Sequence, residues 1–378
     1  MPNVRLALAQ TNPTVGDILG NSELIFEAVC DAAAQGANLV LFGEMALTGY
    51  PIEDLSSRPE FLRDAQLAVA ALALRIHDFS LGEVAVVVGH PRAVQADEVD
   101  SEHEWSIAQN TASLLLRGHV AGTYAKHHLP NYSVFDEYRN FVPGEELLTF
   151  EHCGLRFSTV ICEDIWQDGG PVAKIGEAGT DVTLVLNGSP FELDKVGRRI
   201  ELVRHLAKTH DCGTVYVNLV GGQDDLVFDG ASFAVDRHGN LVAQAEAFKT
   251  DLVLIDISAE GEIAQVTPAR NQPSSEIEAV WHALVLGMRD YVEKNHFKSV
   301  VLGLSGGIDS AVCAAIARDA IGSNGVFGVA MPSRYSSDGS ITDAEDLAAR
   351  LEISIRTEPI EAFFEAFQGQ LQLTDLRS

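Results

Sequence analysis

Two groups of residues in this chain could carry out chemistry, and each directly follows an apolar stretch. Cys162 comes at the end of an apolar strand-like run that includes residues 160–161. A thiol nucleophile in such a place can attack an amide and release ammonia. Residues 305–310 read Ser-Gly-Gly-Ile-Asp-Ser, follow the apolar run 300–304 and can hold phosphate groups. Together the two groups indicate an enzyme that takes nitrogen from glutamine and uses ATP to form a new amide.

A cysteine nucleophile needs partners, and two charged residues are candidates. The thiol must lose its proton to attack a carbonyl, so a base must lie nearby, and the oxyanion that forms needs a cation or a hydrogen-bond donor. Glu44 follows a predicted strand beside Gly43, and Lys126 also follows a predicted strand. We expect Glu44 to be the base and Lys126 to stabilise the anion. The alternative for each residue alone is a core cysteine and solvated charges.

The second group, residues 305–310, lacks the Gly-Lys-Ser/Thr ending of a Walker loop. Gly306 and Gly307 let the backbone approach a ligand closely, and the N-terminus of the helix that follows favours an anion. Ser305 and Ser310 can donate hydrogen bonds to phosphate oxygens, and Asp309 can help to hold Mg²⁺. The spacing predicts an ATP site.

The elements that must position Cys162 mix strands with helices over residues 1–257. Helical spacing predicts a helix that ends at Gly36, and residues 231–245 read as a hairpin with a glycine turn at 237–240. Layered α and β structure is therefore expected, rather than a purely parallel sheet. The predicted strands are residues 4–9, 38–42, 84–89, 111–116, 156–161, 182–186 and 214–218, and the predicted helices are 22–35 and 191–210.

Residues 258–275 are rich in Gly, Pro, Asn and Ser and are predicted to be a linker. Residues 276–378 form a second part with a βαβ order, which implies a parallel sheet with its ligand at the strand ends. Its predicted helices are 276–293, 309–320 and 342–350, and its predicted strands are 299–304 and 325–330.

Composition narrows the class of protein. At 378 residues the chain is longer than one ordinary domain, so two domains are expected. A formal net charge of −28 argues against a nucleic-acid partner, because phosphates need a basic surface. The five cysteines include no Cys-x-x-Cys pair, which argues against a disulfide framework or a zinc site. With no long apolar run and no signal-peptide pattern, we expect a cytoplasmic protein outside any membrane.

Three sequence motifs occur in an order that resembles the nitrilase superfamily. They are Gly-Glu-x-x-Leu-Thr-Gly-Tyr-Pro from Gly43, Tyr-x-Lys-x-x-Leu-Pro-Asn-Tyr around Lys126, and Ile-Cys-Glu-Asp-x-Trp around Cys162. The resemblance covers about residues 4–257. It implies an αββα sandwich with Glu44 as general base, Lys126 as oxyanion stabiliser and Cys162 as nucleophile.

Further residues resemble the glutamine-hydrolysing branch of that superfamily. Residues 135–139 resemble the segment that carries a second glutamate, so Glu137 is expected to orient the lysine or the substrate. Residues 187–190 resemble a substrate-binding Asn-Ala-Ser-Pro segment, with Gly188 in place of the usual alanine. For the aromatic residues the alternative is core packing. The candidates for holding glutamine are Tyr50, Tyr132, Trp166, Ser189 and Lys195.

The phosphate-binding sequence resembles the pyrophosphate loop of the ATP pyrophosphatases, which transfer AMP from ATP. Alone it also fits synthetases for asparagine, GMP or argininosuccinate, and tRNA sulfur-transfer enzymes. Residues 331–337, followed by Thr-Asp-Ala at 342–344, resemble NAD synthetase. That resemblance implies a partial Rossmann-like parallel α/β domain, with Arg334 and Ser336 as further nucleotide contacts.

Both halves together resemble the glutamine-dependent NAD synthetases. The resemblance implies that glutamine, ATP and deamido-NAD are substrates, that Mg²⁺ assists, and that no prosthetic group is needed. It also implies that ammonia travels between the two sites inside the protein. We expect a homo-oligomer.

The synthetase half, at residues 276–378, is shorter than a complete domain of that family. We therefore expect a truncated product with possible glutaminase activity and doubtful NAD formation. Two alternatives stay open. One is a free-standing nitrilase-type amidase, and the other is an inert subunit that serves in assembly.

Overall fold

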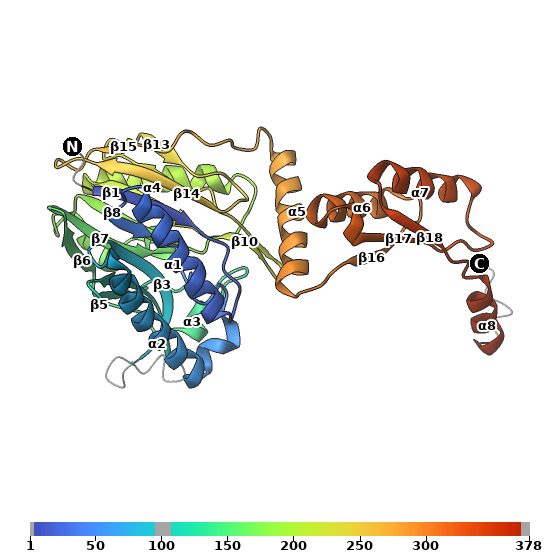
Figure 1. The fold of residues 1–378 in the computed structure, drawn as a ribbon, viewed down its shortest axis with the longest axis horizontal. Helices are drawn as coiled ribbons and strands as arrows, with labels where there is room; N and C mark the ends of the chain where they lie inside the picture. The colour runs from blue at the N-terminus through green and yellow to red at the C-terminus, as the bar shows by residue number, and fades with distance from the viewer. Residues whose placement is uncertain (1–3, 95–106, 372–378) are drawn as a thin grey trace. The chain divides into compact units, whose positions relative to one another are not determined.

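The computed structural model of the chain describes residues 4–94 and 107–371 (Figure 1). It divides between Ala279 and Val280 into two units, each with its own core. The division falls in the first turn of helix α5 (Glu276–Lys294). The predicted linker is not structureless throughout, because residues 263–265 form an edge strand of the first unit.

One sheet of the first unit joins strands that are far apart in the sequence. Its order is β15-β14-β1-β2-β3-β4-β5. β1, β2 and β3 pair in parallel, and the remaining neighbours pair antiparallel. The strands are β1 (Val4–Gln10), β2 (Leu39–Leu41), β3 (Ala85–Ala93), β4 (Ala108–Leu116), β5 (His119–Ala125), β14 (Asp251–Ile257) and β15 (Ile263–Gln265).

The second sheet of this unit has the order β13-β12-β9-β8-β7-β6. Its three central strands, β7 to β9, are parallel, and the outer ones are antiparallel. The predicted hairpin is confirmed as β12 and β13. The strands are β6 (Leu148–His152), β7 (Leu155–Ile161), β8 (Val182–Asn187), β9 (Gly213–Asn218), β12 (Phe233–Val235) and β13 (Leu241–Gln244), with a separate pair of β10 (Val220–Gln223) and β11 (Leu226–Asp229).

Side chains alternate between the two faces of each strand, and this alternation separates the inner core between the sheets from the outer core under the helices. In β1, Leu6 and Leu8 face the second sheet and pack in one core with Phe157, whereas Ala7 and Ala9 pack in another core with the helices. Helices α1 (Ile18–Ala34) and α2 (Pro59–Ile76) lie side by side on that outer face (Figure 1). Helix α4 (Lys195–His210) packs against β9 and β12 on the other sheet. The predicted αββα sandwich is thereby confirmed.

Several helix boundaries differ from the prediction: α1 begins at Ile18 instead of residue 22, and α7 (Asp338–Leu351) begins at Asp338 instead of residue 342. Helix α4 begins at Lys195, not at residue 191, because Phe191 donates its N–H to Val227 and Asp194 has a left-handed backbone with φ of 60°. Helix α2 was not predicted. Its outward-facing Leu67 and Leu74 are 61% and 55% exposed, so apolar residues surround the helix and blur its periodicity.

The second unit is a small parallel α/β structure. Its sheet has the order β16-β17-β18 with parallel pairing throughout, as the βαβ order predicted. Helices α6 and α7 cover one face of it. The elements are β16 (Val300–Gly303), α6 (Ile308–Ile321), β17 (Val326–Ala330), α7 (Asp338–Leu351), β18 (Ser354–Thr357) and α8 (Glu361–Leu371), and the last two were not predicted.

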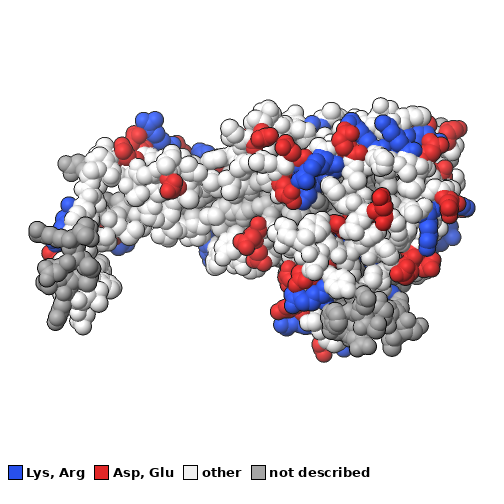
Figure 2. Space-filling view, turned by 180° about the vertical axis from the view of Figure 1, so that it is seen from behind, with Lys and Arg blue, Asp and Glu red and all other residues white. Residues whose placement is uncertain are grey.

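Most charged side chains lie at the surface. On the face that Figure 2 shows, acidic and basic side chains are interspersed among the described residues. Arg117 and Glu83 are typical, since they pair at 3.0 Å while both side chains stay largely exposed. Among the described residues no helix has both the length and the apolar character needed to cross a membrane.

Candidate functional site

The four predicted catalytic residues of the first unit come together in its interior. Glu44 follows β2, Lys126 follows β5, Cys162 follows β7, and Glu137 begins the short helix α3 (Glu137–Asn140). Their exposed fractions are 1%, 1%, 6% and 2%. Strand ends from both sheets and the short helix α3 therefore bring these side chains to one buried place.

Lys126 is held between two carboxylates. Its ammonium nitrogen lies 2.8 Å from Oε1 of Glu44 and 2.8 Å from Oε2 of Glu137. The Tyr50 hydroxyl donates to the other oxygen of Glu137 at 2.8 Å. The lysine is thus fixed in position and stays cationic in a water-poor environment, as an oxyanion stabiliser must be.

Neighbours of Glu44 fix that carboxylate as well. Asn110 of β4 donates from Nδ2 to Oε1 at 2.6 Å. The backbone N–H of Gly188 donates to Oε2 at 2.8 Å. Because both oxygens are occupied by donors, Glu44 cannot turn away from the site.

Burial and charge set the protonation of the group. Burial alone lowers the pKa of Lys126, but the charges of Glu137 and Glu44 outweigh it and hold that pKa well above its usual value. Burial raises the pKa of Glu137 to about 7, with Lys126 opposing and Glu44 adding to the rise. Burial and the charge of Glu44 raise the pKa of the Cys162 thiol, against the effect of Lys126. At rest the lysine is charged and the thiol is neutral, so the thiol proton must leave as the attack occurs.

The backbone at Cys162 is in a conformation that favours glycine. Its φ is +42°, at the point where β7 ends and a short 3₁₀ helix (Cys162–Ile165) begins. A non-glycine residue held there is rare and requires support from its surroundings. The sharp turn presents the thiol at the end of the strand, which fits a nucleophile.

The predicted glutamine-binding residues differ in their exposure to solvent. Tyr50, Ser189 and Lys195 are buried, at 5%, 3% and 8% exposure. Tyr132 is exposed, but its hydroxyl donates to Glu163 at 2.9 Å. Trp166 is half-buried and packs against the main core, so the packing that was its alternative interpretation does occur.

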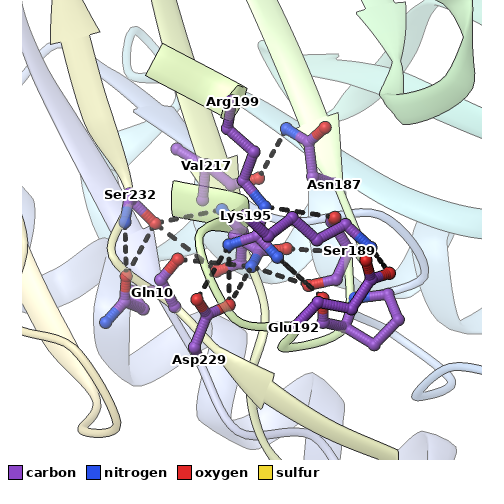
Figure 3. Close-up of polar contacts among 12 residues, drawn as sticks. Gln10, Asn187, Ser189, Glu192, Lys195, Arg199, Val217, Asp229 and Ser232 are labelled. Carbon is purple, nitrogen blue, oxygen red and sulfur yellow. Dashed lines mark hydrogen bonds and ion pairs between the residues drawn. The ribbon is translucent and has the colours of Figure 1, made fainter. Parts of the chain in front are cut away.

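Ser189 is held by a buried ion pair (Figure 3). Arg199 of α4 bonds to both oxygens of Asp229, at 2.7 and 2.9 Å, and each side chain is 1% exposed. Arg199 also donates to the carbonyl oxygens of Ser189 at 2.8 Å and Pro190 at 2.9 Å. Asn218 accepts from the Ser189 N–H at 2.9 Å. The segment that carries Gly188 and its bond to Glu44 is therefore rigid.

Lys195, a predicted glutamine contact, has a charged partner within the protein. Its ammonium group pairs with Glu192, a contact that is drawn in Figure 3. Glu192 lies in the segment before α4. A glutamine carboxylate would have to replace or join that partner.

Sequence reasoning missed four residues that shape this site, namely Asn110, Glu163, Asp164 and Arg199. Glu163 and Asp164 lie in the motif around Cys162, yet the motif does not reveal what their side chains contact. Arg199 was only one basic residue of a predicted helix. The missing signal was the burial of these polar and charged side chains, which depends on tertiary structure.

In the second unit, residues 304–307 connect β16 to α6, and this loop forms hydrogen bonds with itself and with the first turn of α6. The Ser310 hydroxyl donates to the Gly307 carbonyl at 2.9 Å, and the Gly307 N–H donates to the Ser305 hydroxyl at 3.3 Å. Asp309 is exposed in the first turn of α6. The N–H groups at the start of this helix remain available to an anion.

Gly306 is the position in this loop where only glycine fits. Its φ is +77°, and a Cβ there would lie 2.4 Å from the carbonyl oxygen of Ser340 in α7. The first turn of α7 therefore packs directly on the loop. The two elements border a cavity of about 260 Å³ lined by Gly303, Leu304, Ser305, Ala330, Met331, Pro332, Ser336, Ser340 and Ile341.

The two further residues predicted to contact the nucleotide, Ser336 and Arg334, differ in their position relative to this cavity. Ser336 lines the cavity. Arg334 does not line it, because its guanidinium pairs with Glu361 and with Glu365 at 3.0 Å, both on α8. Contact between Arg334 and a nucleotide requires exchange of these partners.

Asp309 is the carboxylate that the loop offers to a magnesium ion. Within residues 4–94 and 107–371, no group of three or more His, Cys, Asp or Glu is arranged to hold a metal. Mg²⁺ commonly takes one or two carboxylates and completes its shell with water and substrate phosphates. One exposed aspartate fits an ion that arrives with ATP.

Comparison with known proteins assigns both units. A carbon-nitrogen hydrolase family profile matches residues 5–265, and an NAD synthase profile matches residues 280–377. Glutamine-dependent NAD(+) synthetase from Acinetobacter baylyi is 37% identical over 372 residues, which cover 98% of this chain and 65% of that protein. The enzyme of the same name from Aquifex aeolicus is 38% identical, with 98% and 68% covered. The chain thus spans about two thirds of the length of these relatives.

Solved structures agree with this assignment. Glutamine-dependent NAD+ synthetase from Acinetobacter baumannii, solved in complex with ADP, is 36% identical with a TM-score of 0.89, covering 99% of this chain and 68% of that one. An amidase from Nesterenkonia sp. is 23% identical with a TM-score of 0.57, covering 69% of this chain and 92% of its own. The amidase supports the sandwich fold alone.

Proposed function

The chain belongs to the family of glutamine-dependent NAD(+) synthetases, and from this membership we propose that it takes part in NAD synthesis as a ligase that forms a carbon–nitrogen bond. In this proposal the first unit hydrolyses glutamine, and the second unit uses the ammonia to amidate deamido-NAD. The observation that carries the proposal is the buried contact of Lys126 with Glu44 and Glu137, close enough to Cys162 for their charges to affect its pKa.

The first half-reaction begins at the thiol of Cys162. Its sulfur attacks the side-chain carbonyl carbon of glutamine while its proton passes to Glu44. Lys126 stabilises the oxyanion of the tetrahedral intermediate. When the intermediate collapses, the carbon–nitrogen bond breaks, Glu44 returns the proton to the nitrogen, and ammonia leaves a thioester on Cys162.

Water completes the half-reaction. Glu44 removes a proton from a water molecule, whose oxygen attacks the thioester carbonyl. The carbon–sulfur bond breaks, glutamate leaves, and the sulfur regains its proton. Glu137 does not exchange protons with substrate in this scheme. It holds Lys126 at 2.8 Å and accepts from Tyr50 at 2.8 Å, so it orients the cation.

In the second half-reaction, the carboxylate of deamido-NAD attacks the α-phosphate of ATP. An adenylate forms, pyrophosphate leaves, and ammonia then displaces AMP to give NAD. Residues 305–310 and the first turn of α6 bind the phosphates in this proposal, with backbone N–H groups and the hydroxyls of Ser305 and Ser310 as donors. Asp309 would be the protein ligand of a bound Mg²⁺, which would neutralise charge on the phosphates.

We also place the protein in the cytoplasm and expect it to form a homo-oligomer. All five cysteines are free thiols in the structure, which fits a reducing compartment.

On the outer face of α2, Leu67 and Leu74 are exposed, and an apolar surface of this kind suits contact with a second copy. Light scattering after size-exclusion chromatography tests the oligomer: the mass of one chain at micromolar concentration would contradict it.

The deciding experiment measures glutamate and NAD together. The chain is incubated with glutamine, with and without ATP, Mg²⁺ and deamido-NAD, and compared with Cys162→Ala. We expect the substitution to abolish glutamate release, because alanine has no sulfur on which the thioester could form. Acid quenching should trap a glutamyl adduct on the peptide that contains Cys162 in the unsubstituted chain.

The same assay separates the alternatives. Glutamate release without NAD would identify a glutaminase whose synthetase half is inactive as it stands. Release that ATP and deamido-NAD do not stimulate would favour a free-standing amidase. No release under any condition, together with stable binding to a full-length relative, would favour an inert assembly subunit.

A further inference from the structure

The side chain of Asp164 lies where strands from the two stacked sheets end. β5 of one sheet leads into Lys126, and β7 of the other sheet leads into Cys162. Asp164 follows the cysteine by two positions and is 0% exposed. The proposed reaction makes no use of its charge, yet a buried carboxylate is costly unless its hydrogen bonds serve the structure around it.

The first oxygen of Asp164 holds the segment after the lysine. Oδ1 accepts the backbone N–H of His127 at 3.0 Å and that of His128 at 2.8 Å. These are the two residues that directly follow Lys126. The imidazole Nδ1 of His128 also lies 3.7 Å from this oxygen.

The second oxygen of Asp164 holds the segment before the nucleophile. Oδ2 accepts the backbone N–H of Ile161, the residue before Cys162, at 3.0 Å. It also accepts the hydroxyl of Tyr124 at 2.7 Å. One planar group therefore contacts the main chain beside both catalytic residues, and its two oxygens are joined by a rigid bond angle.

We propose that Asp164 is a positioning residue that fixes the thiol of Cys162 relative to the ammonium of Lys126. This inference rests on the proposed hydrolysis of glutamine. The carboxylate acts through the backbone and touches no substrate. Precise placement matters here, because a displacement of a catalytic group by about 1 Å can reduce a reaction rate by about a hundredfold.

Asparagine cannot replace Asp164 without loss, although it has nearly the same shape. An amide has one acceptor oxygen, whereas the site presents donors to both oxygens. Whichever way the amide of an Asp164→Asn variant turned, its NH₂ group would face N–H donors either at residues 127–128 or at Ile161. One of the two catalytic segments would lose its anchor.

The test combines turnover with reactivity of the thiol. Asp164→Asn is compared with the unsubstituted chain for glutamate release and for alkylation by iodoacetamide. Alkylation is measured by mass spectrometry on tryptic residues 157–174, where Cys162 is the one cysteine. Iodoacetamide reacts with the thiolate, and the charge of Lys126 favours that thiolate. Reactivity therefore reports the placement of the lysine even without glutamine.

We expect Asp164→Asn to lower kcat by about tenfold to a hundredfold and to leave KM within about threefold. Alkylation of Cys162 should slow by a similar factor, and its pH profile should move to higher pH. Asp164→Glu, which keeps the charge but shifts the carboxylate by one methylene, should also lower kcat. If the Asp164→Asn variant does not fold, the same measurements on Asp164→Glu test the inference instead.

Two controls separate positioning from folding. Asp251→Asn, on β14, removes a carboxylate that binds two backbone N–H groups and Arg270, away from residues 126 and 162, and should leave kcat and alkylation unchanged. Tyr124→Phe removes one donor but leaves the three backbone contacts of Asp164, so its effect on kcat should stay within about threefold.

The outcomes distinguish this inference from the proposed function. If folded Asp164→Asn and Asp164→Glu match the unsubstituted chain in kcat and alkylation, and only their melting temperature falls, Asp164 is merely structural and the inference is wrong. If the unsubstituted chain releases no glutamate but alkylation of Cys162 slows in both variants, the proposed function fails while the positioning role stands.

Discussion

The charged groups of the first unit's site are buried and paired, whereas the polar groups of the second unit's loop are exposed. Lys126 and Glu44 are each 1% exposed and in contact, but Ser305 and Asp309 face solvent. The surroundings differ as well. Two large cores support the first site, while Val301 and Phe327 on the sheet of the second unit are 69% and 41% exposed.

This difference follows from the chemistry proposed for each unit. Stabilising an oxyanion with one ammonium group requires a low effective dielectric and fixed partners. Binding phosphate through backbone N–H groups at a helix N-terminus works near solvent, because the donors are part of the helix itself. The first site can therefore be complete before substrate arrives, whereas the second depends on what the nucleotide brings.

The largest expected effect tests the buried pairing. Lys126→Met removes the cation and leaves the carboxylates of Glu44 and Glu137 unpaired in the interior. We expect glutamate release to fall by about a hundredfold to a thousandfold and the free energy of unfolding to fall by about 3–5 kcal/mol. Coupled enzymatic detection of glutamate and urea denaturation measure the two effects.

A matched surface substitution serves as the control for this prediction. Lys249 pairs with Glu246 while its own side chain is 65% exposed, so Lys249→Met should change the free energy of unfolding by no more than about 1 kcal/mol. Equal losses from the two lysines would contradict the contrast between the sites.

The next effect is a pH dependence that comes from burial. Burial raises the pKa of Glu137 from 4.5 to about 7, so the folded protein binds this proton more tightly than the unfolded chain does. The stabilisation is fully present below pH 4.5 and is lost as the pH rises through about 7. Between these limits the free energy of unfolding should fall by on the order of 3 kcal/mol, as urea denaturation at several pH values would measure.

Glu137→Gln isolates this contribution, since the amide does not titrate. Its free energy of unfolding should depend less steeply on pH over that window than that of the unsubstituted chain. Parallel curves for the two proteins would show that Glu137 does not titrate there and that the interior of the site is wetter than its burial indicates.

The smallest effect on glutamate release is expected from the exposed loop of the second unit. Gly306→Ala and Gly322→Ala place an alanine at nearly the same φ, +77° and +78°, but only Gly306 meets a neighbour, the Ser340 carbonyl. Both should lose about 1–3 kcal/mol from backbone strain, because L residues rarely adopt so positive a φ. Gly306→Ala should lose roughly a further 1–3 kcal/mol from overlap, and it should weaken ATP binding as measured by calorimetry.

Glutamate release tells whether this loss stays local. Both glycines lie in the second unit, so each variant should release glutamate from glutamine alone at a rate within about twofold of the unsubstituted chain. If Gly306→Ala and Gly322→Ala were equally stable, the close packing of α7 on the loop would not matter in solution.

Local patterns predicted much of the fold where apolar periodicity is clear. The parallel strands β2 and β7, which lead to Glu44 and Cys162, lie where apolar runs indicated. The pattern failed at α2, whose outer face is apolar, and at the start of α4, where Phe191 bonds to β11 instead of joining the helix. In both places a contact with another element, or an exposed apolar face, overrode the local signal.

The candidate site was also predictable in part. Glu44, Lys126 and Cys162 each follow a strand, and motifs around them carry the family resemblance. Arg334 shows what a motif leaves open: its motif predicts a nucleotide contact, which stays a prediction, but does not reveal that its guanidinium pairs with Glu361 and Glu365 of α8. A motif specifies residue types and order, but not which of several oppositely charged neighbours a side chain selects.

The sequence by itself determined the reactive groups, their order along the chain and the strands that carry them, because these depend on residue type and short-range periodicity. Tertiary structure alone decided the partners. Glu44 meets Lys126 across 82 positions of sequence, and Asp164 joins the ends of two sheets. Burial, fixed geometry and shifted pKa values all arise from such long-range contacts, which no local pattern encodes.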